Sequence, residues 1–128
     1  MRNRLLNLDP QKRYFEKYQT LIESHLGSLS EKSNHPLTIM FSVGGAGAQK
    51  EIGVKILKCL TPKIKEGKVK VILSAGIREK VKEYFEKNLK EFKCNEISPR
   101  YIEIIFEKDV ESYFQKFNQA LRKTDILW

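Results

Sequence analysis

The sequence contains few of the residues that mark several large protein classes. Among its 128 residues there are two cysteines, two histidines, four prolines and seven glycines. Cys59 and Cys94 lie far apart without a signal peptide, which argues against a disulfide framework, and the two histidines do not have the spacing of a metal site. Low glycine and proline content argues against a low-complexity chain. A globular domain remains, because 41% of the residues are hydrophobic and 10% are aromatic.

Long hydrophobic runs are also missing. No apolar segment reaches the roughly 18 residues that a membrane span needs. The first residues, MRNRLLNLDPQKR, lack the apolar core and the cleavage site of a secretory signal. We therefore expect a cytoplasmic protein with reduced thiols. Cys59 lies in a helical apolar pattern, and it is expected to be a small buried hydrophobic residue.

Acidic residues are in the minority. There are 24 Lys and Arg against 16 Asp and Glu, giving a net charge of +8 and a pI near 9.5. Such a surplus favours nucleic-acid binding when the basic residues form one patch. Here the lysines alternate with glutamates, as in KVKEYFEKNLKEFK, which is typical of solvated helix faces. Nucleic acid is therefore disfavoured as a partner, and a basic nucleic-acid binder is the least favoured functional hypothesis.

The N-terminal part is predicted to be helical. Apolar spacing predicts a helix over residues 10–26, with Asp9 as its N-cap and Pro10 in its first position. The polar stretch 28–36 is predicted to be a connector between this helix and the remainder of the chain. We therefore divide the chain into residues 1–36, an N-terminal helix and polar connector, and residues 37–128, which we expect to be a Rossmann-like half domain.

The second unit alternates between strand and helix patterns. Strand-length apolar runs lie at 37–43, 69–74, 101–106 and 125–128, and amphipathic helices are predicted at 50–60, 78–92 and 110–122. This alternation predicts right-handed crossovers and a parallel sheet. The expected fold class is α/β, a three-layer, Rossmann-like parallel sheet of about four strands with an extra N-terminal helix. Glu103 is expected to face outward, which favours an edge position for its strand.

A glycine-rich loop joins the first predicted strand to the helix after it. Glycines allow positive φ and let a ligand approach the main chain. The next helix directs unpaired N–H groups and its positive end toward the loop, which favours a phosphate. The loop is therefore predicted to contact a ligand, while a bare strand-to-helix turn is the alternative. Its residues are Gly44, Gly45, Ala46, Gly47, Ala48 and Gln49.

Two well-known phosphate motifs do not fit this loop. It is not a P-loop, because no Gly-Lys-Ser/Thr follows it. Lys50 stands where a dinucleotide fingerprint has its third glycine. A second candidate turn, Gly76, Ile77 and Arg78, follows the 69–74 strand. Arg78 has the chemistry to meet a phosphate, and a solvated first-turn arginine is the simpler alternative.

The order of these segments resembles the C-terminal, donor-binding domain of GT-B glycosyltransferases. The nearest group contains the N-acetylglucosaminyltransferase of peptidoglycan synthesis and the diacylglycerol glycosyltransferases. The resemblance covers residues 37–128. It rests on the Gly-Gly loop, on Ala75-Gly76 after the second strand, on Asp109 before the third helix and on the strand that begins at Asp125. The loop GGAGA is one residue shorter than the Gly-Gly-x-x-Gly-Ala of the peptidoglycan enzyme.

This resemblance implies a nucleotide-sugar ligand, such as a UDP-sugar, and no bound cofactor or metal. It implies that the glycine loop lies near the donor diphosphate and that Gly76 and Ile77 line the same cleft. It implies no catalytic residue here, because the base of such enzymes usually belongs to a preceding domain. The chain is then expected to be an inactive fragment of a glycosyltransferase, peripheral to the membrane if the acceptor is lipid-linked.

The alternative is a stand-alone α/β module that binds a partner or assembles with itself. An open sheet edge would pair with a second copy of the chain. The third helix is expected to face the sheet with its apolar side chains, which are Val110, Tyr113, Phe114, Phe117 and Leu121.

Overall fold

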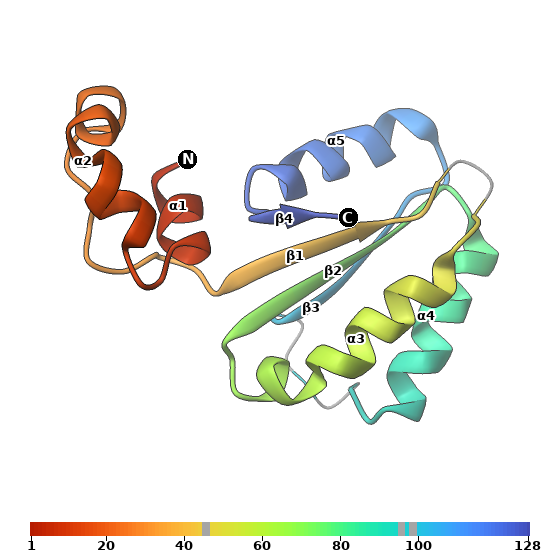
Figure 1. Cartoon of the computed structure of the whole chain (residues 1–128). Coiled ribbons are helices and arrows are strands. Elements are labelled where there is room, and N and C mark those ends of the chain that lie inside the picture. Colours follow the sequence, from red (N-terminus) through yellow and green to blue (C-terminus); the bar gives the residue numbers. More distant parts are fainter. Residues whose placement is uncertain (45–46, 95–96, 98–99) are drawn as a thin grey trace.

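The chain folds into a parallel sheet with helices on both faces, preceded by two further helices (Figure 1). The structure is a computed structural model that describes residues 1–44, 47–94, 97 and 100–128. Its elements in chain order are α1 (Arg2–Leu8), α2 (Arg13–Leu26), β1 (Leu37–Ser42), α3 (Lys50–Lys65), β2 (Val69–Gly76), α4 (Glu79–Glu91), β3 (Ile102–Phe106), α5 (Val110–Leu121) and β4 (Ile126–Leu127). The predicted three-layer α/β fold class is thereby confirmed.

The strand order is β3-β2-β1-β4, and every neighbouring pair is parallel. The chain moves outward from β1 through β2 to β3, and then crosses back to place β4 on the other side of β1. The order therefore reverses between β1 and β4. In open α/β sheets, ligands bind beyond the carboxyl ends of the strands at such a reversal. The predicted edge position of β3 is confirmed.

Two apolar layers enclose the sheet. Helices α3 and α4 cover one face, where Phe41 and Phe85 belong to the larger buried cluster, and α5 covers the other (Figure 1). Met40, Ile72 and Ala120 belong to the smaller cluster under α5. β2 is buried on both faces, as its near-continuous apolar run predicts for a central parallel strand.

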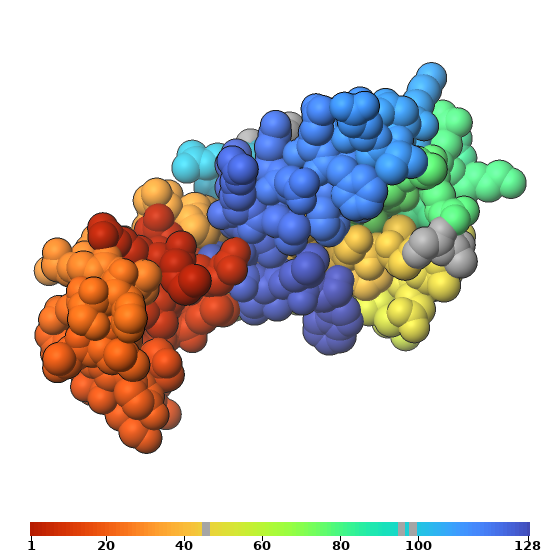
Figure 2. Space-filling view, turned by 90° about the horizontal axis from the view of Figure 1, so that it is seen from above, coloured from red at the N-terminus to blue at the C-terminus, as the bar shows by residue number. Residues whose placement is uncertain are grey.

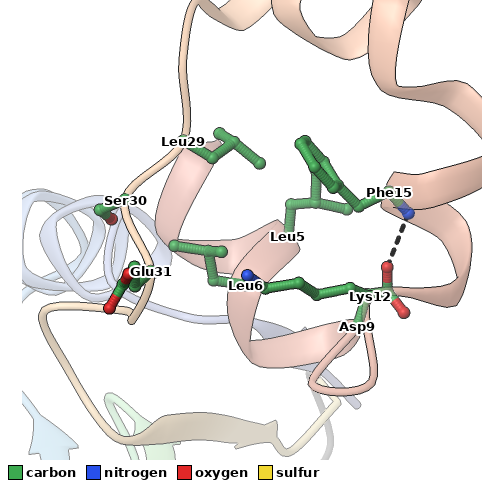
Figure 3. Close-up of a pocket in the computed structure, with 8 residues that line it drawn as sticks. All are labelled: Leu5, Leu6, Asp9, Lys12, Phe15, Leu29, Ser30 and Glu31. Atoms are coloured by element: carbon green, nitrogen blue, oxygen red, sulfur yellow. Dashed lines mark hydrogen bonds between the residues drawn. The ribbon is translucent and has the colours of Figure 1, made fainter.

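The N-terminal unit contains two helices where one was predicted over 10–26. Asp9 follows α1 instead of standing directly before α2. Its carboxylate nevertheless accepts a hydrogen bond from the Phe15 N–H, 2.8 Å away in the first turn of α2 (Figure 3). The N-cap of α2 is Lys12, so the predicted N-cap residue and the predicted helix start are both wrong, although the Asp9 carboxylate still binds one N–H group of the first turn. Pro10 lies in the turn between the helices, where its fixed φ suits a break in the helix.

A small cavity of about 70 Å³ lies between α1, α2 and the connector. Leu5, Leu6, Phe15 and Leu29 line it together with polar side chains (Figure 3). A space of this size holds only a few water molecules. It is a gap between partly buried side chains of α1, α2 and the connector.

Two further sequence predictions are wrong in detail. Helix α3 does not stop before Pro62 but continues through it to Lys65. Cys59 is exposed, because the buried face of α3 is formed by other residues, among them Val54 and Leu57. Both thiols are free, and Cys94 is the buried one.

Candidate functional site

A cleft of about 330 Å³ opens at the carboxyl edge of the sheet. It is bordered by the end of β1, by the turn after β2 and by the first two turns of α5. Its lining residues are Val43, Gly44, Ala75, Gly76, Ile77, Arg78, Val110, Tyr113 and Phe114. Gly44 and the turn 76–78, which the sequence marked as two separate candidates, therefore border the same cleft.

Two residues of this cleft, Gly44 and Gly76, have no side chain to cover their main-chain atoms. A Cβ atom added at Gly44 or at Gly76 would meet nothing within 4 Å. Both positions therefore face open space. Gly76 also has a φ of +67°, a backbone conformation that residues other than glycine rarely adopt. The backbone can be approached by a ligand at both positions.

The glycine loop and the second turn touch each other. The Gly47 N–H donates to the Gly44 carbonyl oxygen at 2.8 Å. Gly47 has a φ of +70°, and a Cβ there would lie 3.1 Å from Cδ of Arg78 and from Cγ2 of Val81. The absence of a side chain at Gly47 therefore lets the stem of Arg78 pack against the loop.

The remaining loop residues divide into two groups. Ala48 and Gln49 are exposed and do not line the cleft, and Gln49 precedes α3 with a φ of 65°. The predictions for Gly45 and Ala46 fall outside the described residues. Thus the structure brings Gly44, Gly47 and the 76–78 turn together and leaves Ala48 and Gln49 at the rim.

The helix ends near this edge differ in their capping. The Asp109 carboxylate accepts a hydrogen bond from the Ser112 N–H at 2.8 Å and caps α5. This bond lowers the pKa of Asp109, because it stabilises the ionised carboxylate. Helices α3 and α4 have no side-chain cap, although each has a glutamate in its first turn. Uncapped N–H groups at a helix start favour an anion.

The wall that α5 contributes was not predicted from the sequence. Val110 and Phe114 were expected to face the sheet, but each is 53% exposed. Tyr113 does turn inward, and its hydroxyl lies 2.8 Å from the Ser74 Oγ. The first turn of α5 lies near the carboxyl ends of the strands (Figure 1). Part of its apolar stripe therefore borders the cleft instead of covering the sheet. No signal in the sequence separates Val110 and Phe114 from the core positions of α5, because all of these apolar residues follow the same helical period.

The described segments offer little evidence for two other kinds of site. Within them, no group of three or more His, Cys, Asp and Glu side chains is arranged to hold a metal ion. Among the helices that are described, none combines the length and the apolar character needed to cross a membrane.

Comparison with known proteins identifies a family but no characterised relative. A comparison with curated proteins and one with solved structures gave no match. A family model does match, over residues 28–127, and its description is "Domain of unknown function (DUF6938)". The matched segment contains the whole sheet and the cleft, while α1 and α2 precede it. Because the match covers most of the sequence, the chain belongs to the DUF6938 family.

Proposed function

We propose that the carboxyl-edge cleft binds the diphosphate part of a nucleotide sugar, and that the chain is part of a GT-B-like glycosyltransferase. One observation carries the proposal. The cleft lies beside β1, where the strand order reverses, and it combines the open main chain of Gly44 and Gly76 with Arg78. Ligands of open α/β sheets bind at this place.

The chemistry of the lining suits a ligand with both charged and apolar parts. Main-chain N–H groups and an arginine are common partners of phosphate oxygens. The exposed faces of Phe114 and Val110 offer apolar surface for a ring. A volume near 330 Å³ fits the lower end of the range for small-molecule pockets. In sugar transfer, such groups would stabilise the leaving diphosphate, and no residue of this chain is assigned as the catalytic base.

Addition of UDP or a UDP-sugar is expected to raise the melting temperature. Ligand at about ten times its Kd stabilises the native state by about 1.4 kcal/mol, which corresponds to a few degrees for a domain of this size. Gly44→Val should abolish the shift, because its side chain would occupy the open space of the cleft, where an added Cβ atom meets nothing within 4 Å. Differential scanning calorimetry with millimolar ligand measures this effect.

The matched control is Lys87→Gln, which removes a positive charge from the exposed face of α4. This variant should keep the full shift, whereas Arg78→Gln should weaken binding at least tenfold in Kd. The proposal is wrong if millimolar ligand leaves the melting temperature unchanged. An equal shift in the wild type and in Gly44→Val would also contradict it.

A second candidate function is self-assembly through β4. In the described residues this strand pairs with β1 alone, so its other edge is open. Ile126, Leu127 and Trp128 are exposed at the same place. Open edges and clustered apolar side chains both favour association.

Light scattering is expected to detect dimers at high protein concentration if this second function holds. Leu127→Lys should then shift the protein to monomers, because an inserted charge opposes edge-to-edge pairing. The matched variant Lys87→Gln should not change the mass. A monomer at all concentrations would exclude the self-assembly function and leave the cleft as the functional feature.

A further inference from the structure

A second cavity, of about 220 Å³, lies at the amino edge of the sheet, away from the cleft. It forms where α1, the connector and the turn between α5 and β4 meet. Figure 2 shows the red residues of α1 beside the blue C-terminal part of the chain. The lining is polar or charged except for one methionine: Met1, Asn3, Arg4, Asn34, His35, Arg122, Lys123, Thr124 and Asp125.

Hydrogen bonds between distant segments fix the walls of this cavity. Arg4 Nη2 donates to the carbonyl oxygens of Thr124 at 2.5 Å and Leu121 at 3.3 Å. The Asn34 N–H donates to Asn3 Oδ1 at 3.2 Å. These hydrogen bonds hold α1 and the connector beside the α5–β4 turn, so the fold determines the position of several groups that line this open cavity.

The single carboxylate of the cavity already has its partners. Asp125 Oδ2 accepts from the Thr38 N–H at 2.9 Å and from Asn7 Nδ2 at 2.8 Å. His35 Nε2 lies 3.1 Å from the same oxygen, and the Asp125 side chain is 1% exposed. Asp125 is thus turned into the protein, where it holds β1, α1 and the connector together.

The cations of the cavity are in excess over this carboxylate. Arg4, Arg122 and Lys123 all line it. Arg4 donates to the carbonyl oxygen of Leu121, the last residue of α5, and to that of Thr124 in the turn that follows, so its charge lies near the negative end of that helix. Arg122 and Lys123 form no side-chain hydrogen bond or ion pair within residues 1–44, 47–94, 97 and 100–128. The side chains of Arg122 and Lys123 therefore border a polar space, and within the described residues their N–H groups donate no hydrogen bond.

We infer that this cavity binds an oxyanion of the phosphate type. Arg122 would supply the planar pair of N–H donors that matches phosphate oxygens, and Lys123 would supply a second positive charge. The Asn34 and Asn3 amides provide further polar contacts at the wall. A bound phosphate group would connect α1 and the connector to the α5–β4 turn, and would thereby hold the N-terminal helices on the sheet. The inference is independent of the function proposed for the carboxyl edge.

Inorganic phosphate, titrated at constant ionic strength, is the probe. Amide chemical shifts of Asn34 and Thr124 should change in a saturable way, while the amide of Lys87, on the exposed face of α4, should not respond. The double variant Arg122→Gln/Lys123→Gln should weaken binding at least tenfold. The matched control is Lys55→Gln/Lys87→Gln, which removes the same charge from exposed positions on α3 and α4 and should bind phosphate as the wild type does.

Three results would overturn the inference. The shifts could fail to saturate, chloride could reproduce them, or the double variant could bind phosphate with unchanged affinity. Arg122 and Lys123 are both exposed, so the double variant is expected to fold, and its amide spectrum checks this directly. The wild-type shifts at Asn34 and Thr124 remain a test of the site whatever the behaviour of the variants.

Discussion

Replacing Asp125 with alanine is expected to lower the free energy of unfolding by about 3 kcal/mol, because one buried and two partly buried groups lose the carboxylate that they share. The Thr38 N–H at the start of β1, the Asn7 amide of α1 and the His35 ring all meet this carboxylate. Alanine leaves the buried Thr38 N–H without its partner and separates three segments of the chain. Urea unfolding followed by circular dichroism measures the loss.

Asp125→Asn is the matched variant. An amide oxygen can still accept from the Thr38 N–H, so about half of the stability loss should be avoided. Asn7→Ala removes the contact to α1 and leaves the Thr38 bond intact, so its cost should be near 1 kcal/mol. A loss below about 1 kcal/mol for Asp125→Ala, or equal losses for all three variants, would show that the carboxylate does not join these segments.

The sheet was predictable because its strands are chemically distinct from their surroundings. β1 and β2 are near-continuous apolar runs, which only strands buried on both faces require. The turns at Gly44 and Gly76 were recognisable for the same local reason, since glycines after strands indicate special backbone geometry. Parallel pairing then brings their ends to one edge of the sheet.

Features that depend on distant contacts were not predictable. The pair of His35 and Asp125 joins residues 90 positions apart, and no local pattern marks either side chain. Val110 and Phe114 follow the helical period as core residues do, and the period does not tell how far α5 extends beyond the strands. The short α1 was missed because its seven residues have no side-chain cap to mark their start.

Gly53 lies where α3 packs tightly against two aromatic rings of the core. It is buried within the helix. A Cβ atom there would lie 2.6 Å from Phe41 Cδ1 and 3.3 Å from Phe85 Cε1. Both rings are buried, at 3% and 0% exposure, so neither can move aside into solvent. The glycine is required by packing, not by its backbone conformation.

Gly53→Ala is therefore expected to destabilise the protein, although alanine is favoured over glycine in a helix by about 1 kcal/mol. Overpacking a core costs about 1–3 kcal/mol, so the net loss for alanine should be near 1 kcal/mol. Gly53→Val adds two methyl groups against Phe41 and should cost more than about 3 kcal/mol. Gly44→Ala, whose added carbon meets nothing within 4 Å, is the control and should change stability by less than about 0.5 kcal/mol.

A double-mutant cycle with Phe41 tests whether contact with this ring causes the loss of stability in Gly53→Ala. Phe41→Leu alone should destabilise the core, because it removes part of a buried ring. Combined with Gly53→Ala, it gives the new carbon room, so the double variant should be more stable than the sum of the two single losses predicts. If the two losses of unfolding free energy simply add, contact with Phe41 is not the reason for a glycine at position 53. In that case the close contact between α3 and β1 would not explain why a residue with poor helix propensity stands inside a helix.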